Sequence, residues 1–212
     1  MIIDCVSDLH GYYPALPGGD ILVVAGDLAY TDHLSSYHLF GAWLGKQAYN
    51  KIIVVAGNHD GLFQTQGTLP SDNLFECATY LCDSGIEYGG LKIWGSPWTP
   101  TFQNWYFMKE RGDEIKAKWD LIPDDTEILI THGPPHGILD FVIDYDTGFS
   151  KHVGCEELRM AIHFRLKKLK LHIFGHIHER YGCLVSDGVE YVNCSHVDEY
   201  YRPKNKPIRV IL

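Results

Sequence analysis

The sequence predicts an α/β fold in which largely parallel strands form a layered sandwich. Three observations lead to this prediction. Short apolar runs rich in Val, Ile and Leu recur along the chain, as is typical of strands buried on both faces. Each run ends in a polar tip that carries Asp, Asn or His, usually beside a Gly. Crossover segments follow these tips, and the repeated order of strand, tip and crossover indicates parallel pairing.

Length and charge limit the classes of function. The 212 residues suffice for a sizeable core, and we expect residues 1–212 to form a single domain. The composition, 45% hydrophobic and 21% charged, is ordinary for a globular protein. A formal net charge of −9 argues against a partner such as double-stranded nucleic acid, whose binders present a basic face. A small anionic substrate stays compatible, because a bound cation reverses the local field.

The cysteines and the N-terminus bear on location. Six cysteines form neither a CxxC pair nor a zinc-ligand spacing, and most lie beside apolar residues. We interpret them as small buried side chains in a reducing compartment. Met1-Ile2-Ile3 already begins a strand, so no signal peptide is expected, and no apolar run approaches a membrane span. These features predict a cytoplasmic protein with no membrane partner.

The first half of the chain contains three strands that end in polar tips. A helix is expected from His33 to Tyr49, because its apolar side chains recur at helical spacing. A lone Asp-x-His pair, or an Asp at a strand end, is more often a turn or a helix N-cap than a ligand. The strands and their tips are Ile2–Val6 before Asp8 and His10, Ile21–Val24 before Asp27, and Ile52–Val55 before Gly57-Asn58-His59-Asp60.

The second half repeats the pattern after an interval rich in turns. Gly61 to Asn73 is expected to form a rim over the site, and Leu74 to Trp94 short hairpin strands. The aromatic stretch Trp94 to Phe107 is interpreted as packing in preference to a base-stacking platform. The remaining expected elements are a helix at Asp113–Trp119, a strand at Glu127–Ile130 before His132, a loop at Ile138–Val153, a helix at Cys155–Lys168, a strand at Leu171–Phe174 before Gly175-His176-Ile177-His178, a hairpin around Ser186-Asp187-Gly188 and a strand at Ile208–Ile211.

The polar tips together predict a metal site. The carboxyl ends of neighbouring strands converge in α/β folds, so these side chains can meet. Oxygen and nitrogen donors without a thiolate favour Mn, Fe, Zn, Co or Ni over a structural zinc cage. Seven donors exceed the needs of one ion, and a carboxylate such as Asp27 can bridge two. The predicted ligands are Asp8, His10, Asp27, Asn58, His132, His176 and His178.

Charge arithmetic indicates the substrate. Two divalent ions bring four positive charges, and two aspartates with a bridging hydroxide return three, which leaves about +1. Such a site attracts a phosphate ester in spite of the acidic chain around it. The ions lower the pKa of bound water and polarise a phosphoryl oxygen.

In order and wording, the motifs of this chain resemble those of the calcineurin-like metallophosphoesterases, over roughly positions 2 to 194. The motifs are Asp8-x-His10, Gly26-Asp27, Gly57-Asn58-His59-Asp60, Thr131-His132 and Gly175-His176-x-His178. This resemblance implies the metallo-dependent phosphatase fold, a four-layer α-β-β-α sandwich of two mixed sheets flanked by helices. Gly95-Ser96-Pro97-Trp98-Thr99-Pro100, Thr131-His132-Gly133-Pro134-Pro135 and Phe174 to Glu179 are similar to the brain metallophosphoesterase subgroup, which is similar to class III cyclic-nucleotide phosphodiesterases.

The resemblance also implies roles. Asp27 would bridge two ions, and His59 would face the phosphate and assist the leaving group of a reaction that uses a metal-bridging hydroxide. Asp60 would orient His59. Manganese is the expected metal in vitro. The implied ligands are Asp8, His10, Asp27 and His178 for the first ion and Asp27, Asn58, His132 and His176 for the second; the substrate-binding candidates are Asn58, His59 and His136, with Trp98 and Phe102 as further pocket candidates.

One departure narrows the substrate. Phosphoprotein phosphatases continue after the bridging Asp with Asp-Arg-Gly, whereas this chain reads Leu28-Ala29-Tyr30 before Thr31-Asp32. The missing arginine favours a phosphodiesterase that acts on small phosphodiesters or cyclic nucleotides. Alternatives are a phosphomonoesterase, a nuclease for short substrates, and a nucleotide-binding regulator of low activity. An exposed aromatic loop is also compatible with a homodimer.

Overall fold

The computed structural model describes residues 1–65, 76–143 and 148–212. The rim predicted from Gly61 to Asn73 lies largely outside these ranges, as do the first residues of the predicted hairpin region. The described part of the rim forms helix α2 (Gly61–Thr65), directly after the third polar tip.

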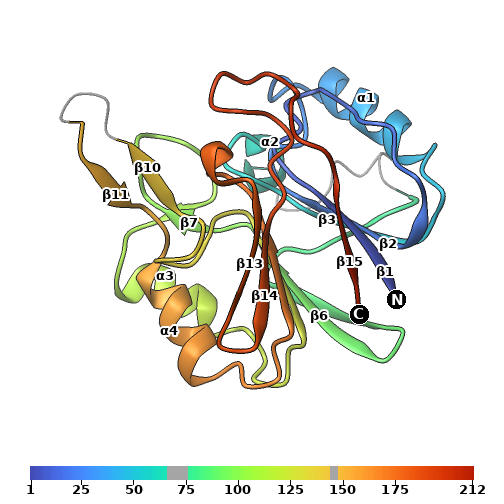
Figure 1. The fold of residues 1–212 in the computed structure, drawn as a ribbon. Helices are drawn as coiled ribbons and strands as arrows, with labels where there is room; N and C mark the ends of the chain where they lie inside the picture. The colour runs from blue at the N-terminus through green and yellow to red at the C-terminus, as the bar shows by residue number, and fades with distance from the viewer. Residues whose placement is uncertain (66–75, 144–147) are drawn as a thin grey trace.

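Two mixed sheets form the centre of the fold (Figure 1). In the first sheet, β1, β2, β3 and β4 run parallel, and β15 pairs antiparallel with β1. The strand order is β15-β1-β2-β3-β4. Their bounds are Ile2–Val6 for β1, Gly19–Ala25 for β2, Tyr49–Val55 for β3, Thr79–Tyr80 for β4 and Ile208–Ile211 for β15.

The second sheet has the order β13-β14-β12-β9-β6-β5. Its four inner strands are parallel, and the two edge strands pair antiparallel with their neighbours. Turns at Gly89-Gly90 and at Asp187-Gly188, the second of them expected from the sequence, join the edge strands to the sheet. The bounds are Ser84–Tyr88 for β5, Leu91–Ser96 for β6, Ile128–Thr131 for β9, Leu171–Phe174 for β12, Gly182–Ser186 for β13 and Val189–Asn193 for β14.

Alternating side chains build the layers. Odd-numbered residues of β1, β2 and β3, such as Ile3 and Val23, meet Ile130 and Ile173 of the second sheet in a buried core between the sheets, which Val210 of β15 joins. Even-numbered residues pack under helix α1 (Leu34–Leu44), and the outer face of the second sheet packs under α3 (Asp113–Trp119) and α4 (Glu156–Phe164). The predicted four-layer α-β-β-α sandwich is confirmed.

Two predicted helices are too long. Helix α1 begins at Leu34 and ends at Leu44, because Gly45 caps it and a tight turn follows. Tyr49 begins β3 instead, where it pairs with Gly19. Helix α4 begins at Glu156, with Cys155 as its N-cap, and ends at Phe164. After α4, Leu166 and Leu169 stay buried in the core, so the hydrophobic periodicity continues past the C-terminus of this helix. After α1, residues 45–48 are exposed or half-buried.

The predicted loop from Ile138 to Val153 is wrong in part. It contains an antiparallel pair formed by β10 (Phe141–Ile143) and β11 (Ser150–His152). The β-branched and aromatic residues of β10 suit a strand, but β11 is polar and exposed, so its sequence carries no strand signal. A second short pair encloses part of the aromatic stretch: β7 (Thr99–Pro100) lies within the stretch and pairs with β8 (Met108–Lys109), which follows directly after it.

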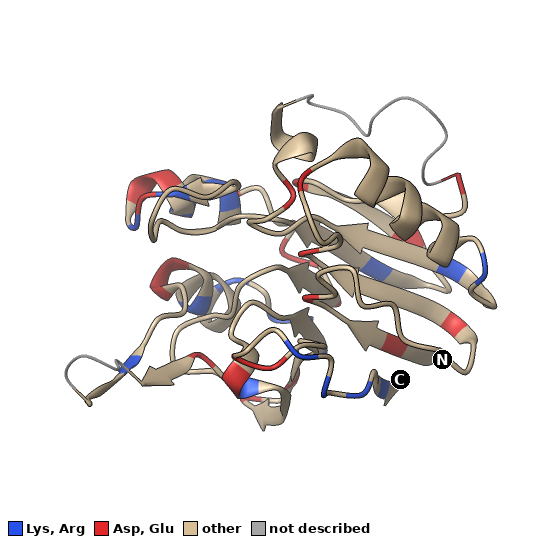
Figure 2. Cartoon of the chain, turned by 90° about the horizontal axis from the view of Figure 1, so that it is seen from above, with Lys and Arg blue, Asp and Glu red and all other residues tan. Residues whose placement is uncertain are grey.

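Charged residues of both signs are mixed along the chain. Lys and Arg are interspersed with Asp and Glu over the elements seen in Figure 2. Among the described residues, no helix combines the length and the apolar content needed to cross a membrane.

Candidate metal centre

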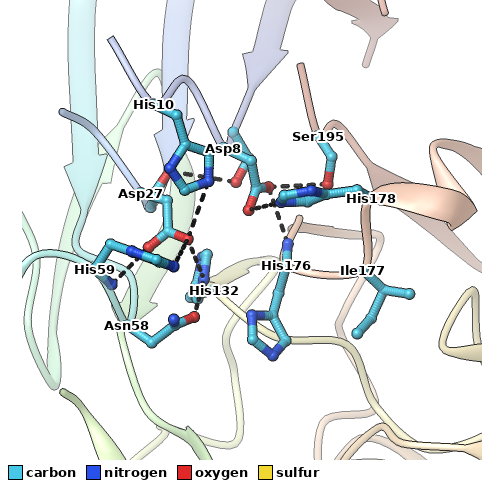
Figure 3. Close-up of polar contacts among 12 residues, drawn as sticks. Asp8, His10, Asp27, Asn58, His59, His132, His176, Ile177, His178 and Ser195 are labelled. Carbon is cyan, nitrogen blue, oxygen red and sulfur yellow. Dashed lines mark hydrogen bonds and ion pairs between the residues drawn. The ribbon is translucent and has the colours of Figure 1, made fainter. Parts of the chain in front are cut away.

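The carboxyl ends of strands from both sheets meet at one place (Figure 3). Side chains of the predicted ligand types project there from five separate strand ends. They are Asp8 and His10 after β1, Asp27 after β2, Asn58 after β3, His132 after β9, and His176 and His178 after β12.

Four of these residues have a left-handed backbone. The φ angle is +50° at Asp8, +42° at His10, +53° at Asp27 and +70° at His176. Residues other than Gly rarely adopt this conformation, which costs on the order of 1–3 kcal/mol per residue. Hydrogen bonds between the tips hold it: the N–H of Asp8 donates to the carbonyl of Gly26 at 2.9 Å, and that of His10 to the carbonyl of Asp27 at 3.1 Å. Strain of this kind is concentrated at functional sites.

Glycines beside the donors allow the side chains to approach. A Cβ atom at Gly26 would lie 2.3 Å from Nδ1 of His132, and one at Gly57 would lie 2.3 Å from Oδ1 of Asp27. Both distances are far below van der Waals contact. The Gly–donor pairing of the sequence therefore has a steric cause.

Asp27 lies at the centre of the cluster. Its Oδ2 atom is 3.5 Å from Nε2 of His10, 3.5 Å from Nε2 of His132 and 4.0 Å from Nε2 of His59. Burial raises the pKa of Asp27, but the nearby His132, His10 and His59 lower it more, so the carboxyl stays ionised. A central ionised carboxylate is the arrangement that bridging requires.

Asp8 anchors the second part of the cluster. Its Oδ1 atom is 3.2 Å from Nε2 of His178, whose Nδ1 donates to the carbonyl of Asp198 at 3.1 Å. Ser195 Oγ and the backbone N–H of His176 each donate to Oδ2 of Asp8 at 2.9 Å. Burial raises the pKa of Asp8, but the bond and charge of His178 bring it below its ordinary range.

His132 and Asn58 present two acceptors to each other. Nδ1 of His132 donates to the carbonyl of Ala25 at 2.9 Å, which leaves Nε2 as the acceptor of the neutral ring. That atom lies 2.9 Å from the Oδ1 acceptor of Asn58. Burial lowers the pKa of His132, but Asp27 raises it more, to about 9. A proton or a metal ion at Nε2 of His132 would satisfy both acceptors.

The residues fit metal binding in a further respect. Nε2 of His10 is buried and has no hydrogen-bond partner among the described residues, which is costly unless it has a ligand. The donor atoms form three groups that can each hold an ion, and within each group the atoms lie within 4.8 Å of one another. They are Asp8 with His10 and His178, His10 with Asp27 and His59, and Asp8 with Asp27 and His132. Because Asp8 and Asp27 each belong to two of the three groups, the groups suit a dinuclear site.

His59 and Asp60 lie together in sequence but have separate environments. The His59 ring packs against Trp105 with centroids 4.2 Å apart, and its backbone N–H donates to Oδ1 of Asp27 at 2.9 Å. The Asp60 carboxylate accepts the N–H groups of Gly57 at 2.7 Å and Leu28 at 3.1 Å. Among the described contacts Asp60 thus fixes the loops that carry Asn58 and Asp27, and no hydrogen bond joins it to the His59 ring.

The remaining candidate residues differ in how close they lie to the cluster and the cavity. The His176 ring lies against His132, with centroids 4.9 Å apart, and is outside the three donor groups. Burial lowers its pKa to about 3, which keeps it in the neutral form that binds metals. His136 packs on His152, at 5.3 Å between centroids, and is not among the described residues that line the cavity. Trp98 packs in the core, whereas Phe102 lines the cavity.

A cavity of about 730 Å³ opens over the cluster. Asp27, Asn58, His59, His176 and His178 lie on its floor, and aromatic side chains surround them. The aromatic residues are Phe102, Trp105 and Tyr201.

Sequence reasoning missed several contributors to the site. Ser195 binds Asp8, and the carbonyl of Asp198 binds His178. Tyr201 places its ring 4.8 Å from His10 and 5.2 Å from His178. These residues come from the C-terminal segment, where the one available signal was the cluster of polar and aromatic residues after Asn193.

Comparisons with known proteins agree with this geometry. A family model described as calcineurin-like phosphoesterase matches residues 1–180. Human metallophosphoesterase domain-containing protein 1 is 38% identical over 98% of this chain and 70% of its own length. A UPF0046 protein of Caenorhabditis elegans is 32% identical over 96% of this chain and 58% of its own. One solved structure superposes with a TM-score of 0.64 at 18% identity, over 91% of this chain and 89% of that one, and supports the fold.

The matched region contains all the donors of the centre, from Asp8 to His178. The chain belongs to the calcineurin-like phosphoesterase family and is a phosphoric ester hydrolase with a His/Asp metal-binding cluster.

Proposed function

We propose that the chain hydrolyses small phosphodiesters, cyclic nucleotides among them, with two divalent ions at the described cluster. A diester has one negative charge on its phosphate, whereas a monoester has up to two. The centre with two bound ions is expected to have a net charge of about +1, which balances the single negative charge of a diester.

The observation that carries this proposal concerns the arginine of the cavity. Among the described residues that line the cavity, Arg111 is the one arginine, and its guanidinium is already occupied. It donates to the carbonyls of Gly154 at 2.8 Å and Val153 at 2.7 Å, and it pairs with Glu156. No second guanidinium lines the described cavity, and its other cation, Lys151, is a point charge that cannot grip a dianionic phosphate with two parallel hydrogen bonds, which favours a diester.

The residues of the chain divide the work. Asp8, His10, Asp27, Asn58, His132, His176 and His178 would hold the ions, which, when bound, supply an activated water and polarise a phosphoryl oxygen. His59 lies at the edge of the cluster with its side chain 26% exposed to the cavity, where it can hold a proton for the leaving oxygen. Trp105 packs against this ring and limits its rotation.

Metal identity and location belong to the same proposal. Nitrogen and carboxylate donors without sulfur suit manganese, which we propose as the metal that supports activity in vitro. We also propose a cytoplasmic location, which the six free thiols support, since thiols persist in a reducing compartment. Double-stranded nucleic acid is not a proposed partner, in view of the net charge of −9. A homodimer stays a prediction.

A substrate comparison tests the proposal. The protein is stripped with a chelator, reloaded with Mn²⁺, and assayed on bis(p-nitrophenyl) phosphate, p-nitrophenyl phosphate and cyclic nucleotides. We expect turnover to depend on added metal and to be faster on the diesters. Asp27→Asn removes the central carboxylate and should abolish turnover, whereas Asp187→Asn, on an exposed turn, should leave it unchanged.

Two outcomes contradict the proposal. Protein that is inert on all diesters with Mn, Fe, Zn, Co and Ni ions is not a phosphodiesterase. Faster turnover of the monoester would instead identify a phosphomonoesterase.

A further inference from the structure

The cavity extends beyond the metal centre to a wall formed by the β10–β11 pair. His152, the last residue of β11, lines this wall with 47% of its side chain exposed. Its Nδ1 atom donates to Oδ1 of Asp140 at 2.6 Å, and the Asp140 side chain is fully buried. An imidazole held by a buried carboxylate at the edge of a reaction cavity is unexplained by the metal centre.

Backbone donors keep the Asp140 carboxylate in place. Its Oδ2 atom accepts the N–H of Gly137 at 2.9 Å and that of Gly154 at 3.0 Å. With two backbone donors and one imidazole, this carboxylate is satisfied as an acceptor in its ionised form. It cannot offer a proton to His152, so Nδ1 of His152 must be the protonated nitrogen.

The His152 ring is also positioned by packing. Phe141 lies opposite it across the β10–β11 pair, with ring centroids 5.6 Å apart, and His136 lies 5.3 Å away. The carbonyl of Val153, the next residue, accepts a hydrogen bond from Arg111. The ring therefore belongs to a braced wall, and a braced side chain loses little conformational entropy on binding.

This geometry leaves one atom of His152 available to a ligand. With Nδ1 committed to Asp140, Nε2 is the ring nitrogen left for a ligand, an acceptor in the neutral ring and a donor in the protonated one, and a hydroxyl can pair with either. Glu179 and Glu199 line the same cavity and add carboxylate acceptors. Lys151 and Arg111 line the same cavity, so its carboxylates and cations offset one another and a charged group is not favoured by them. A neutral hydroxyl can instead pair with His152 or donate to either carboxylate.

We propose that His152 is a substrate-contacting residue that recognises a hydroxyl on the organic group of the phosphodiester, with Asp140 as its positioning residue. This inference rests on the proposed function, because the phosphate is taken to lie at the metal centre. It makes the β10–β11 wall the part of the chain that selects hydroxylated over plain alkyl diesters.

A matched pair of substrates tests the inference. Propyl p-nitrophenyl phosphate is compared with its analogue that has a hydroxyl on the terminal carbon of the propyl group. We expect kcat/KM of the wild-type protein to favour the hydroxylated substrate by roughly 5–10-fold, the worth of one neutral hydrogen bond. His152→Phe keeps a ring of similar shape and should bring the ratio to about 1. His152→Gln restores an acceptor and should recover part of the preference.

The ratio of kcat/KM values does not depend on how much of a variant folds, since both substrates meet the same active fraction. Asp140→Asn should lower the ratio, whereas a residue with a structural role alone would lower both rates equally. His163→Gln, on the exposed surface of α4, is the matched control and should keep the wild-type ratio.

Each other outcome overturns the inference. A wild-type ratio near 1, or an unchanged ratio in His152→Phe, refutes the role of His152 and leaves the diesterase proposal intact. If the wild-type protein hydrolyses bis(p-nitrophenyl) phosphate but neither propyl diester, the inference fails and the proposed function stands. If it hydrolyses no diester at all, both fail.

Discussion

Gly57 lies directly against Asp27 in the metal centre, and adding one methyl group there should disable the site. The Cβ atom introduced by Gly57→Ala would lie 2.3 Å from Oδ1 of Asp27 and 2.7 Å from Cε1 of His132. Ordinary contact begins at 3.4 Å, so Asp27 or the Gly57 backbone must move by about 1 Å. Displacements of this size at reacting groups lower rates by about 100-fold. Overpacking should also cost about 1–3 kcal/mol of stability.

The assay measures kcat on bis(p-nitrophenyl) phosphate, Mn²⁺ affinity by calorimetry and the midpoint of thermal unfolding. Gly57→Ala should lose about 100-fold in kcat and bind Mn²⁺ more weakly, since Asp27 is the central carboxylate of the cluster and a proposed ligand. The matched control is Gly45→Ala, at the end of α1, where a Cβ meets only the carbonyl of Gly41 at 3.6 Å. That variant should keep full activity and wild-type stability.

The steric reasoning is refuted if Gly57→Ala keeps kcat and Mn²⁺ affinity within twofold of the wild type. A loss of activity that merely follows a loss of folded protein would also refute it, which is why activity is normalised to the folded fraction.

Three further perturbations follow from the described contacts. Ser195→Ala removes a hydrogen bond to Asp8 and should weaken Mn²⁺ binding roughly 10-fold in calorimetry, with little change in fold by circular dichroism. Chelation should lower the unfolding midpoint near pH 7, and Mn²⁺ at 100 times its Kd should return about 2.7 kcal/mol of stability. Burial lowers the pKa of His172 to about 3 from an ordinary 6.5, so the unfolded chain takes the proton first as pH falls. The stability that the neutral His172 ring contributes is therefore complete above pH 6.5 and is lost towards pH 3. Between neutral pH and pH 5, the free energy of unfolding measured by denaturant titration should fall by about 2 kcal/mol more in the wild type than in His172→Gln.

The residues of the metal centre were predictable because each has a local signature. Asp27 follows an apolar run and a glycine, and His176 and His178 follow another run in the same way. Parallel pairing then places strand ends together, so a local pattern is enough to predict a long-range cluster.

Residues that reach the site from irregular segments were not predictable in this way. Tyr201 lies in a turn held by Asp198, which accepts the N–H groups of Tyr200 and Arg202, and no periodicity marks it. His152 ends a polar strand whose pairing with Phe141 is a tertiary event. The family resemblance implied that Asp60 orients His59, whereas the described hydrogen bonds of its carboxylate reach Gly57, Leu28 and Tyr37.

The proposed ligands follow strands of both sheets: Asp8, His10, Asp27 and Asn58 follow strands of the first, and His132, His176 and His178 follow strands of the second. An ion bound by residues from both groups would consequently link the two sheets as well as take part in catalysis. Loading the centre should slow amide hydrogen exchange in β2 and β9 together, although no ligand belongs to either strand. Metal binding would then both activate the centre and reduce the motion of the two sheets relative to each other. Without metal, both sheets would become more mobile.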